Sequence, residues 1–169
     1  MIISSLSENK KNEKRIAITP DLVKKYINLG FEVGVPKDYG DHLGFDDQSY
    51  VAEGAKIYNE EKELIEKSDV IVQLGLLSDE QIKLLKSNQT LVGVLNTYEN
   101  KNKLNEISKK KINLFSLELL PRITRAQSMD VLSSQANLAG YKAVVETFSY
   151  FEKAIPMMMT AAGTVPAAK

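Results

Sequence analysis

The sequence predicts an α/β fold, a doubly wound and mostly parallel sheet of the Rossmann-like or flavodoxin-like type with helices on both faces. Short apolar stretches alternate along the chain with helical stretches of about 8 to 12 residues, the order that parallel β-α units produce. Two of the apolar stretches, 69–74 and 90–95, carry runs of Val, Ile and Leu, which is typical of strands buried on both faces.

The first half of the chain supplies three strands and three helices in alternation. One helix is expected to start at Thr19 and Pro20, because Thr is a good N-cap and Pro fits the first helical position. The same helix is expected to end at Gly30. The predicted elements are strands at 2–6, 31–35 and 55–58, and helices at 20–29, 46–53 and 60–67.

The second half continues the alternation and ends in a long helix. Ser78 and Gln81 have the spacing of a capping box, which predicts a helix through Leu85. The last helix is expected to break before Pro156. The predicted elements are strands at 69–74, 90–95 and 112–116, and helices at 78–85, 101–110 and 127–151.

Residues 1–155 are expected to form one N-terminal α/β domain, since a chain of 169 residues is long enough for a single full core. The tail at 156–169, PMMMTAAGTVPAAK, is apolar and rich in small residues, and it has no partner within this fold. We expect the tail to start a linker or crossover to a further domain.

Composition excludes several classes of function. The formal net charge is +0, which argues against a nucleic acid or a membrane surface bound through bulk charge. Cysteine is absent, so the chain has no disulfide framework and no thiolate metal site. No apolar run approaches the roughly 20 residues that a membrane helix needs, so we expect no direct membrane insertion.

The usual signatures of nucleotide and acid–base sites are also missing. No Gly-x-Gly-x-x-Gly fingerprint follows any predicted strand, and there is no Walker-type phosphate loop. The single histidine, His42, lies in a turn-rich loop and is interpreted as a surface residue. One histidine without cysteine predicts no metal site, and nothing near His42 supports a Ser-His-Asp triad.

The stretch from Pro121 to Tyr141, PRITRAQSMDVLSSQANLAGY, is unlike the rest of the chain. Charged residues make up 26% of the sequence, yet between Arg125 and Lys142 the only charge is Asp130. On a helix with about 100° per residue, one face is apolar and the opposite face carries hydroxyls and amides. The polar face comprises Asp130, Ser133, Ser134, Asn137 and Tyr141, with Gln127 just upstream. Such a face suits a hydrogen-bonding ligand or another protein surface.

Structural roles are open for the same residues. Gln127 could form a capping box with Thr124, and Ser133 and Ser134 could donate back to the preceding turn. Arg122 could form a salt bridge where the helix begins. Their gathering on one nearly uncharged face favours a binding role.

The motif from Arg122 to Glu146, RITRAQSMDVLSSQANLAGYKAVVE, closely resembles the alpha subunit of proton-translocating NAD(P) transhydrogenase, within the alanine dehydrogenase/transhydrogenase N-terminal domain family. The similarity extends to EKRIAITP at 13–20, GFEV at 30–33, FDD at 45–47 and the closing MMMTAAGTVPAAK. The resemblance implies an NAD(H)-binding component that exchanges hydride with NADP on a partner domain, coupled to proton flow through a membrane-spanning domain. It also implies a homodimer, peripheral to the bacterial inner membrane on the cytoplasmic side or on the mitochondrial matrix side. The family's second subdomain, a Rossmann unit with the glycine fingerprint, would follow this chain.

The resemblance further implies the site residues. Those at the nicotinamide end of the cofactor would be Arg122, Ile123, Thr124, Gln127, Ser128, Met129, Asp130 and Ser133. Gln127 and Asp130 would be the catalytic pair, with Gln127 near the partner domain's nicotinamide. Hydride transfer between two nicotinamides needs positioning and exclusion of water rather than a general acid or base, so the absence of a catalytic histidine or cysteine fits.

Two other functions compete with this one. The related alanine dehydrogenases need Lys and His around a keto acid, but the corresponding positions hold Gln73, Gly75 and Asn96, and only Arg15 matches a substrate-binding residue. The other candidate is a non-catalytic dimerisation or interdomain module, favoured by the apolar tail after Pro156.

Overall fold

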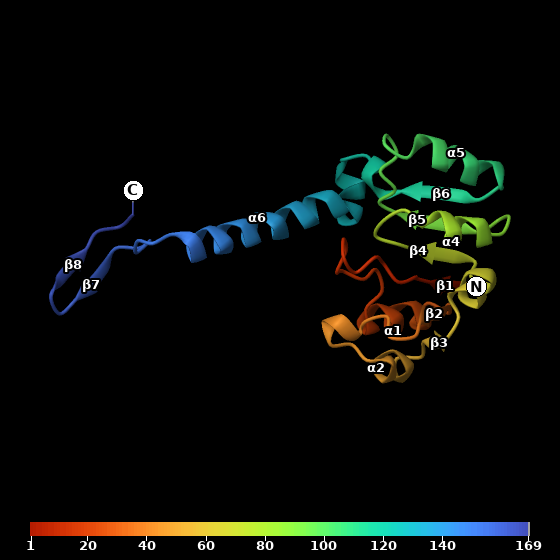
Figure 1. Ribbon diagram of the computed structural model, residues 1–169, viewed down its shortest axis with the longest axis horizontal. Coiled ribbons are helices and arrows are strands. Elements are labelled where there is room, and N and C mark those ends of the chain that lie inside the picture. The colour runs from red at the N-terminus through yellow and green to blue at the C-terminus, as the bar shows by residue number, and fades with distance from the viewer. Residues whose placement is uncertain (169) are drawn as a thin grey trace. The chain divides into compact units, whose positions relative to one another are not determined.

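The computed structural model describes residues 1–168 of the chain. They divide into two compact units, Met1–Pro121 and a second that begins at Arg122 (Figure 1). The first unit contains the sheet and the second contains a long helix and a hairpin.

The first unit is built on a parallel sheet of six strands in the order β3-β2-β1-β4-β5-β6. The strands are β1 (Ile2–Ser4), β2 (Glu32–Pro36), β3 (Lys56–Tyr58), β4 (Val70–Val72), β5 (Thr90–Gly93) and β6 (Asn113–Ser116). The winding reverses between β1 and β4, where Ile3 pairs with Val70. All six predicted strands form, and the doubly wound parallel fold is confirmed.

Five α-helices connect the strands of the first unit. They are α1 (Pro20–Asn28), α2 (Asp47–Ala52), α3 (Glu61–Lys67), α4 (Asp79–Leu84) and α5 (Lys101–Lys109), with short 3-10 turns η1 (Asp41–Leu43) and η2 (Leu117–Leu119). Pro20 stands at the first position of α1, and the predicted capping box between Ser78 and Gln81 is present on α4.

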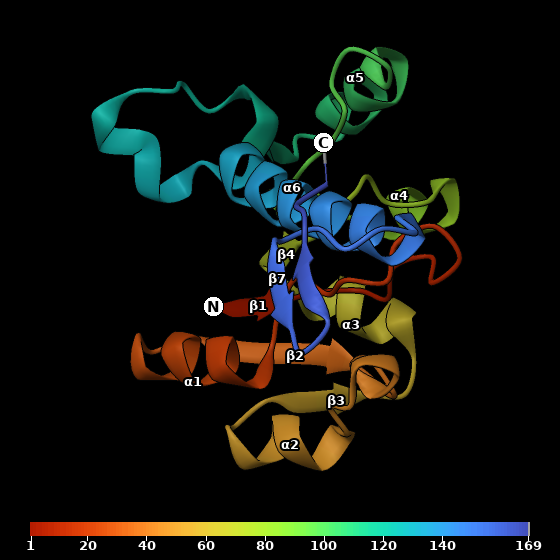
Figure 2. The same ribbon diagram turned by 90° about the vertical axis from the view of Figure 1, so that its left-hand side faces the viewer.

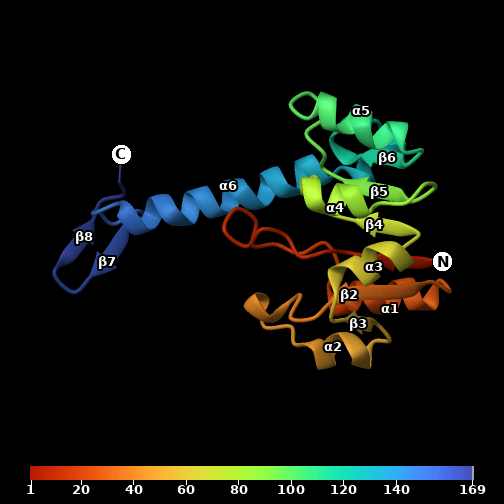
Figure 3. The ribbon, with the colours of Figure 1, turned by 45° about the vertical axis from the view of Figure 1, so that its right-hand side comes forward.

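Two hydrophobic clusters lie on opposite faces of the sheet. Side chains of α1 and α2 pack with Ile3, Val33 and Val35, and Figure 2 shows these helices beside β2 and β3. Side chains of α3, α4 and α5 pack with Ile71 and Leu91, and Figure 3 shows α3 and α4 in front of the sheet. Successive residues of β4 serve both clusters, which explains its uninterrupted apolar sequence.

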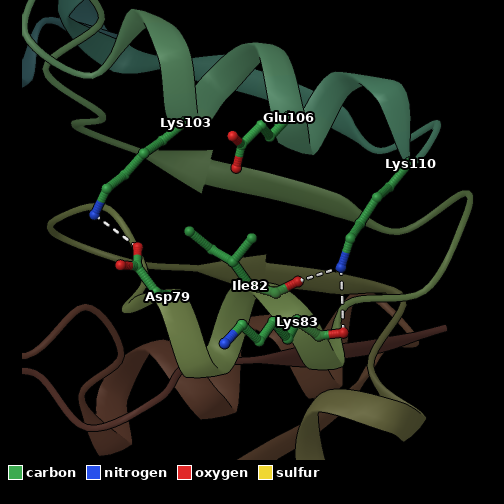
Figure 4. A pocket seen from close by; sticks show the side chains of 6 residues that line it. All are labelled: Asp79, Ile82, Lys83, Lys103, Glu106 and Lys110. Atoms are coloured by element: carbon green, nitrogen blue, oxygen red, sulfur yellow. Dashed lines mark hydrogen bonds and ion pairs between the residues drawn. The ribbon is translucent and has the colours of Figure 1, made fainter.

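Lysine side chains in the groove between α4 and α5 interact with groups of the protein itself (Figure 4). Lys103 forms an ion pair with Asp79 at 2.7 Å. The Lys110 Nζ donates to the main-chain carbonyl oxygens of Ile82 and Lys83, at 2.8 and 3.2 Å. A cation at the carboxyl end of a helix satisfies its last carbonyls and stabilises its dipole. The interactions of Lys103 and Lys110 therefore hold α4 and α5 together.

The second unit differs from its prediction in two respects. The helix predicted over 127–151 is wrong at its start, because a 3-10 segment, η3 (Thr124–Met129), precedes α6 (Val131–Tyr150). Asp130 between them has φ −76° and ψ 88°, which is not helical. The tail, for which no strand is predicted, contains an antiparallel hairpin of β7 (Met158–Thr160) and β8 (Gly163–Val165).

Gly93 tests the packing of β4 against β5. A Cβ added at Gly93 would lie 2.5 Å from the main-chain oxygen of Gln73, and backbone cannot move aside cheaply. We expect Gly93→Ala to lower the free energy of unfolding in urea by about 1–3 kcal/mol. Gly140→Ala, at a helical position with no neighbour within 4 Å, is the matched control and is expected to be neutral or stabilising. Equal stability of the two variants would contradict this packing.

Candidate functional site

The site expected from the sequence lies where η3 meets α6. Asp130 is the N-cap of α6: its Oδ1 accepts the main-chain N–H of Ser133 at 3.0 Å, and its Oδ2 accepts the hydroxyl of Ser133 at 2.6 Å. The hydroxyl of Ser134 donates to the main-chain oxygen of Asp130 at 3.0 Å. These bonds fix the turn in the chain and hence the direction in which the preceding residues face.

These contacts also set the charge of Asp130. Hydrogen bonds from the hydroxyl and the main-chain N–H of Ser133 lower its pKa, and the nearby positive charge of Arg122 acts in the same direction. The carboxylate is therefore ionised at neutral pH. No ion pair of Arg122 within 4 Å occurs in the part of the chain that the structure describes, so its guanidinium is not engaged by a carboxylate.

A hollow of about 250 Å³ opens beside this cap within the second unit, lined by Arg122, Ile123, Thr124, Gln127 and Asp130. All five are among the site residues that the family resemblance implies. Ser133 joins them through its bonds to Asp130. Ser128 and Met129 are exposed on the same turn but do not line the hollow.

The structure confirms some of the structural roles considered for these residues and not others. The capping box between Thr124 and Gln127 is absent, because the cap of η3 is Ile123 and no side chain bonds to it. The hydroxyl of Ser134 donates to the preceding turn, which confirms the structural role predicted for it. The side chain of Gln127 is exposed and has no hydrogen-bond partner among residues 1–168, so it is available to a ligand.

The positions compared with alanine dehydrogenase are engaged within the first unit. Gln73 is buried after β4, and its Oε1 accepts the hydroxyl of Ser5 at 2.9 Å and the main-chain N–H of Leu6 at 2.8 Å. The main-chain N–H of Gly75 donates to Glu8 at 3.3 Å. Arg15 forms an ion pair with Glu13 at 2.6 Å. Gln73 and Gly75 therefore bond to the segment that follows β1, and neither Lys nor His stands at these positions.

Two further features of the first unit lie away from this site. His42 is exposed, with its Nε2 2.7 Å from the main-chain oxygen of Lys14. Asp38, Asp41 and Asp47 place carboxylate oxygens within 4.8 Å of one another, a grouping that sequence reasoning did not single out. Asp47 accepts the main-chain N–H of Asp38 at 3.0 Å, so part of this group organises its own loop.

The exposed surface of α6 is nearly uncharged and carries many apolar side chains. Its only charged side chains, Lys142 and Glu146, form an ion pair with each other at 2.5 Å. Large exposed apolar side chains of this helix include Leu138, Tyr141, Val144, Val145, Phe148 and Tyr150. No helix of the described residues is long and apolar enough to cross a membrane.

The sequence profile of the family described as alanine dehydrogenase/PNT, N-terminal domain, matches residues 5–139. The chain belongs to this family. Among curated relatives, the Rickettsia prowazekii protein described as the first part of NAD(P) transhydrogenase subunit alpha is 44% identical over 173 residues, covering 100% of this chain and 45% of that protein. The Rhodospirillum rubrum protein of the same description is 41% identical over 174 residues, covering 100% of this chain and 45% of that protein.

A solved structure agrees with these relatives. The crystal structure of transhydrogenase from Sinorhizobium meliloti matches with a TM-score of 0.91 at 40% identity, covering 99% of this chain and 50% of that one. The resemblance to transhydrogenase alpha subunits is therefore confirmed over essentially the whole chain. The chain spans about half the length of these relatives.

The Asp130 cap gives a pH-dependent test. Because its folded pKa is lowered, the cap contributes stability above the ordinary carboxyl pKa of about 3.9 and loses it as pH falls through the folded value. We expect Ser133→Ala to raise the pKa of Asp130, followed by NMR of the carboxyl carbon. Ser134→Ala removes a bond to the main-chain oxygen only and should leave this pKa unmoved. Equal shifts in both variants would contradict the assigned bonds.

Proposed function

We propose that the chain is the N-terminal part of the NAD(H)-binding component of a proton-translocating NAD(P) transhydrogenase. In the assembled enzyme, hydride passes between NAD(H) on this component and NADP(H) on a partner domain, coupled to proton translocation by a membrane-spanning domain. The observation that carries the proposal is the hollow beside Asp130, formed by the residues of the transhydrogenase-like motif.

The proposal includes the organisation of the complex. Residues 1–155 form the N-terminal domain, and those from 156 start the crossover to a Rossmann domain that completes the NAD site. The component is a homodimer, peripheral to the membrane on the cytoplasmic or matrix side. The chain alone is inactive, because the glycine turn that binds a pyrophosphate is supplied by that second domain.

The residues of the hollow fit the nicotinamide end of NAD. Arg122 offers hydrogen-bond donors, Asp130 offers acceptors, and Ile123 adds an apolar side chain. Bound NAD(H) would supply the hydride, and the residues of the chain hold the ring and its amide. Gln127 has a free amide on the same hollow and faces the partner's nicotinamide in this proposal. The remaining residues proposed around the nicotinamide end of NAD are Thr124, Ser128, Met129 and Ser133.

The chemistry needs no proton donor at the reacting carbons. A hydride moves as a unit from one ring to the other, so the protein contributes by fixing distance and orientation and by excluding water. The groups at the hollow meet that need: they are an amide, an ionised carboxylate, a hydroxyl and a guanidinium. The alternative of an alanine dehydrogenase is disfavoured because Gln73 is committed to Ser5 and Leu6.

A non-catalytic interface remains the second candidate, favoured by the exposed apolar side chains of α6. The two candidates differ in their response to NADH. A binding site gives NMR shifts confined to residues 122–133 when NADH is added. An interface alone gives shifts that depend on protein concentration and not on NADH.

Reconstitution tests the enzymatic proposal directly. The chain is combined with the complementary Rossmann part and the NADP-binding domain, and hydride transfer is measured with nicotinamide analogues of distinct absorbance. We expect transfer only in the complete mixture, because each nicotinamide needs its own domain. Inactivity of a mixture whose parts are folded and assembled would overturn the catalytic claim.

Gln127 gives a sharper test of positioning. Asn keeps the amide but is one methylene shorter, so Gln127→Asn should lower the rate of hydride transfer by about 10-fold to 100-fold while NADH affinity changes by less than about 3-fold. Transfer is measured by stopped flow and affinity by titration calorimetry. Gln48→Asn, on the exposed surface of α2, is the matched control. Equal losses of rate and affinity would remove the positioning role.

A further inference from the structure

The turn that follows β5 directs two main-chain N–H groups at one carboxylate, that of Glu118. Glu118 lies in η2, directly after β6, and β6 is the neighbour of β5 in the sheet. Its Oε2 accepts the main-chain N–H of Leu95 at 3.1 Å, and its Oε1 accepts that of Thr97 at 3.0 Å. Both oxygens of the carboxylate are therefore held by the same turn.

Asn96, between the two donors, sets the shape of this turn. Its φ is 48°, in the left-handed region that residues with a Cβ seldom adopt and that Asn tolerates better than most. The Nδ2 of Asn100 donates to the main-chain oxygen of Leu95 at 2.9 Å, which adds another bond to the turn. A left-handed residue in a turn brings nearby N–H groups to one side, and the resulting concavity binds anions.

The donors around this concavity suit a carboxylate. Burial alone would raise the pKa of Glu118, but the hydroxyl of Ser116 and the main-chain N–H groups of Thr97 and Leu95 lower it. The Ser116 hydroxyl acts by proximity, since it does not meet the geometry of a full hydrogen bond. These groups are all uncharged. Neutral donors favour a planar, singly charged carboxylate over a phosphate, which Arg and Lys side chains bind best.

The surroundings of the turn also have hydrogen-bonding capacity that Glu118 leaves unused. The hydroxyl oxygens of Thr97 and Ser116 are shielded from solvent, and neither has a hydrogen-bond partner within residues 1–168. A buried polar group without a partner costs free energy. A carboxylate that is not tethered to β6 is free to settle where it meets both N–H groups and a hydroxyl.

The same arrangement occurs a second time in the first unit. Glu8, which follows β1, accepts the main-chain N–H groups of Leu74 and Gly75, which follow β4, at 2.8 and 3.3 Å. β1 and β4 are neighbours in the sheet, as β6 and β5 are. In both cases a glutamate beyond one strand fills the N–H pair beyond the adjacent strand. Capture of a carboxylate is therefore a repeated property of these turns.

We propose that the turn at 95–97 is a carboxylate-binding site, that Glu118 is its internal ligand, and that a small free monocarboxylate binds there once Glu118 is shortened. Acetate matches the vacated space, because Glu118→Ala removes the γ-carbon and the carboxyl group, which are the heavy atoms of acetate. The internal ligand joins the end of β6 to the end of β5, so the occupied site fixes the path of the chain as it leaves the sheet.

Rescue of Glu118→Ala by acetate tests the site in the full chain. We expect this substitution to lower Tm by about 5–10 °C, because two N–H groups lose a charged acceptor. Acetate at about 0.2 M should recover at least about a third of this loss relative to sodium chloride at the same concentration. By NMR, the amide signals of Leu95 and Thr97 should shift with acetate and saturate, with a dissociation constant of roughly 1–100 mM. The bulkier trimethylacetate should give no rescue.

Two variants serve as controls. Glu118→Gln keeps the size of the side chain, so it leaves no room for acetate, and its NH₂ group cannot accept from a main-chain N–H. We expect it to be destabilised without rescue. Glu106→Ala removes an exposed carboxylate that has no hydrogen bond or ion pair among the described residues, and it should show neither the loss nor the rescue.

Each outcome bears on the proposal. Amide shifts that chloride reproduces, or an equal rescue of Glu118→Gln, overturn it. If Glu118→Ala is unfolded in chloride, folding on addition of acetate supports it. If the variant folds in neither salt, the unmodified chain decides: NMR couplings across the hydrogen bonds should join the amide nitrogens of Leu95 and Thr97 to the carboxyl carbon of Glu118. The absence of these couplings overturns the role of Glu118 as internal ligand.

Discussion

The pairing of β1 with β4 is the constraint on which the first unit depends. These two strands lie at the centre of the sheet, and the direction of winding reverses between them. The reversal sends α1 and α2 to one face and α3, α4 and α5 to the other, so both hydrophobic clusters form around it. Beyond the last paired residues, Gln73 joins the two strand ends through its bonds to Ser5 and Leu6. The side-chain oxygen of the buried Gln73, which accepts both bonds, therefore fixes the register of β1 against β4 without a charged group in the core.

The second unit depends on a different contact. None of the residues of α6 is buried, so the start of this helix is defined by the cap rather than by packing. Asp130 stops the 3-10 segment, turns the chain and begins the helix. The same carboxylate lines the hollow. One residue therefore serves as a structural cap and, in the proposed function, as a ligand group, and substitutions there must be judged on both roles.

Most of the fold can be predicted from the sequence because the signals for strands and for helix starts lie within a few neighbouring residues. The strands, the start of α1 and the capping box of α4 follow from apolar runs, a proline and a serine with glutamine. The start of α6 is misplaced because Gln127 and Met129 are good helix formers, and periodicity cannot distinguish a 3-10 turn. The hairpin of β7 and β8 is missed because Met158 and Met159 lack the alternation of a half-buried strand, and both are exposed. At the site, the sequence could name Arg122 and Asp130, but the bonds from Ser133 to Asp130 depend on the non-helical turn at Asp130, which periodicity does not predict.

The register of the central pair also orders events during synthesis. Ile3 pairs with Val70, so β1 gains its second neighbour in the sheet only after synthesis has reached Val70. Until then β1 can pair with β2 alone, and one edge of an apolar strand is open to other chains. Contacts between residues so distant in sequence form slowly because a long loop must close first. Nascent chains of this protein are therefore most vulnerable to misassembly before β4 arrives, and a translational pause just upstream of Val70 would lengthen that period.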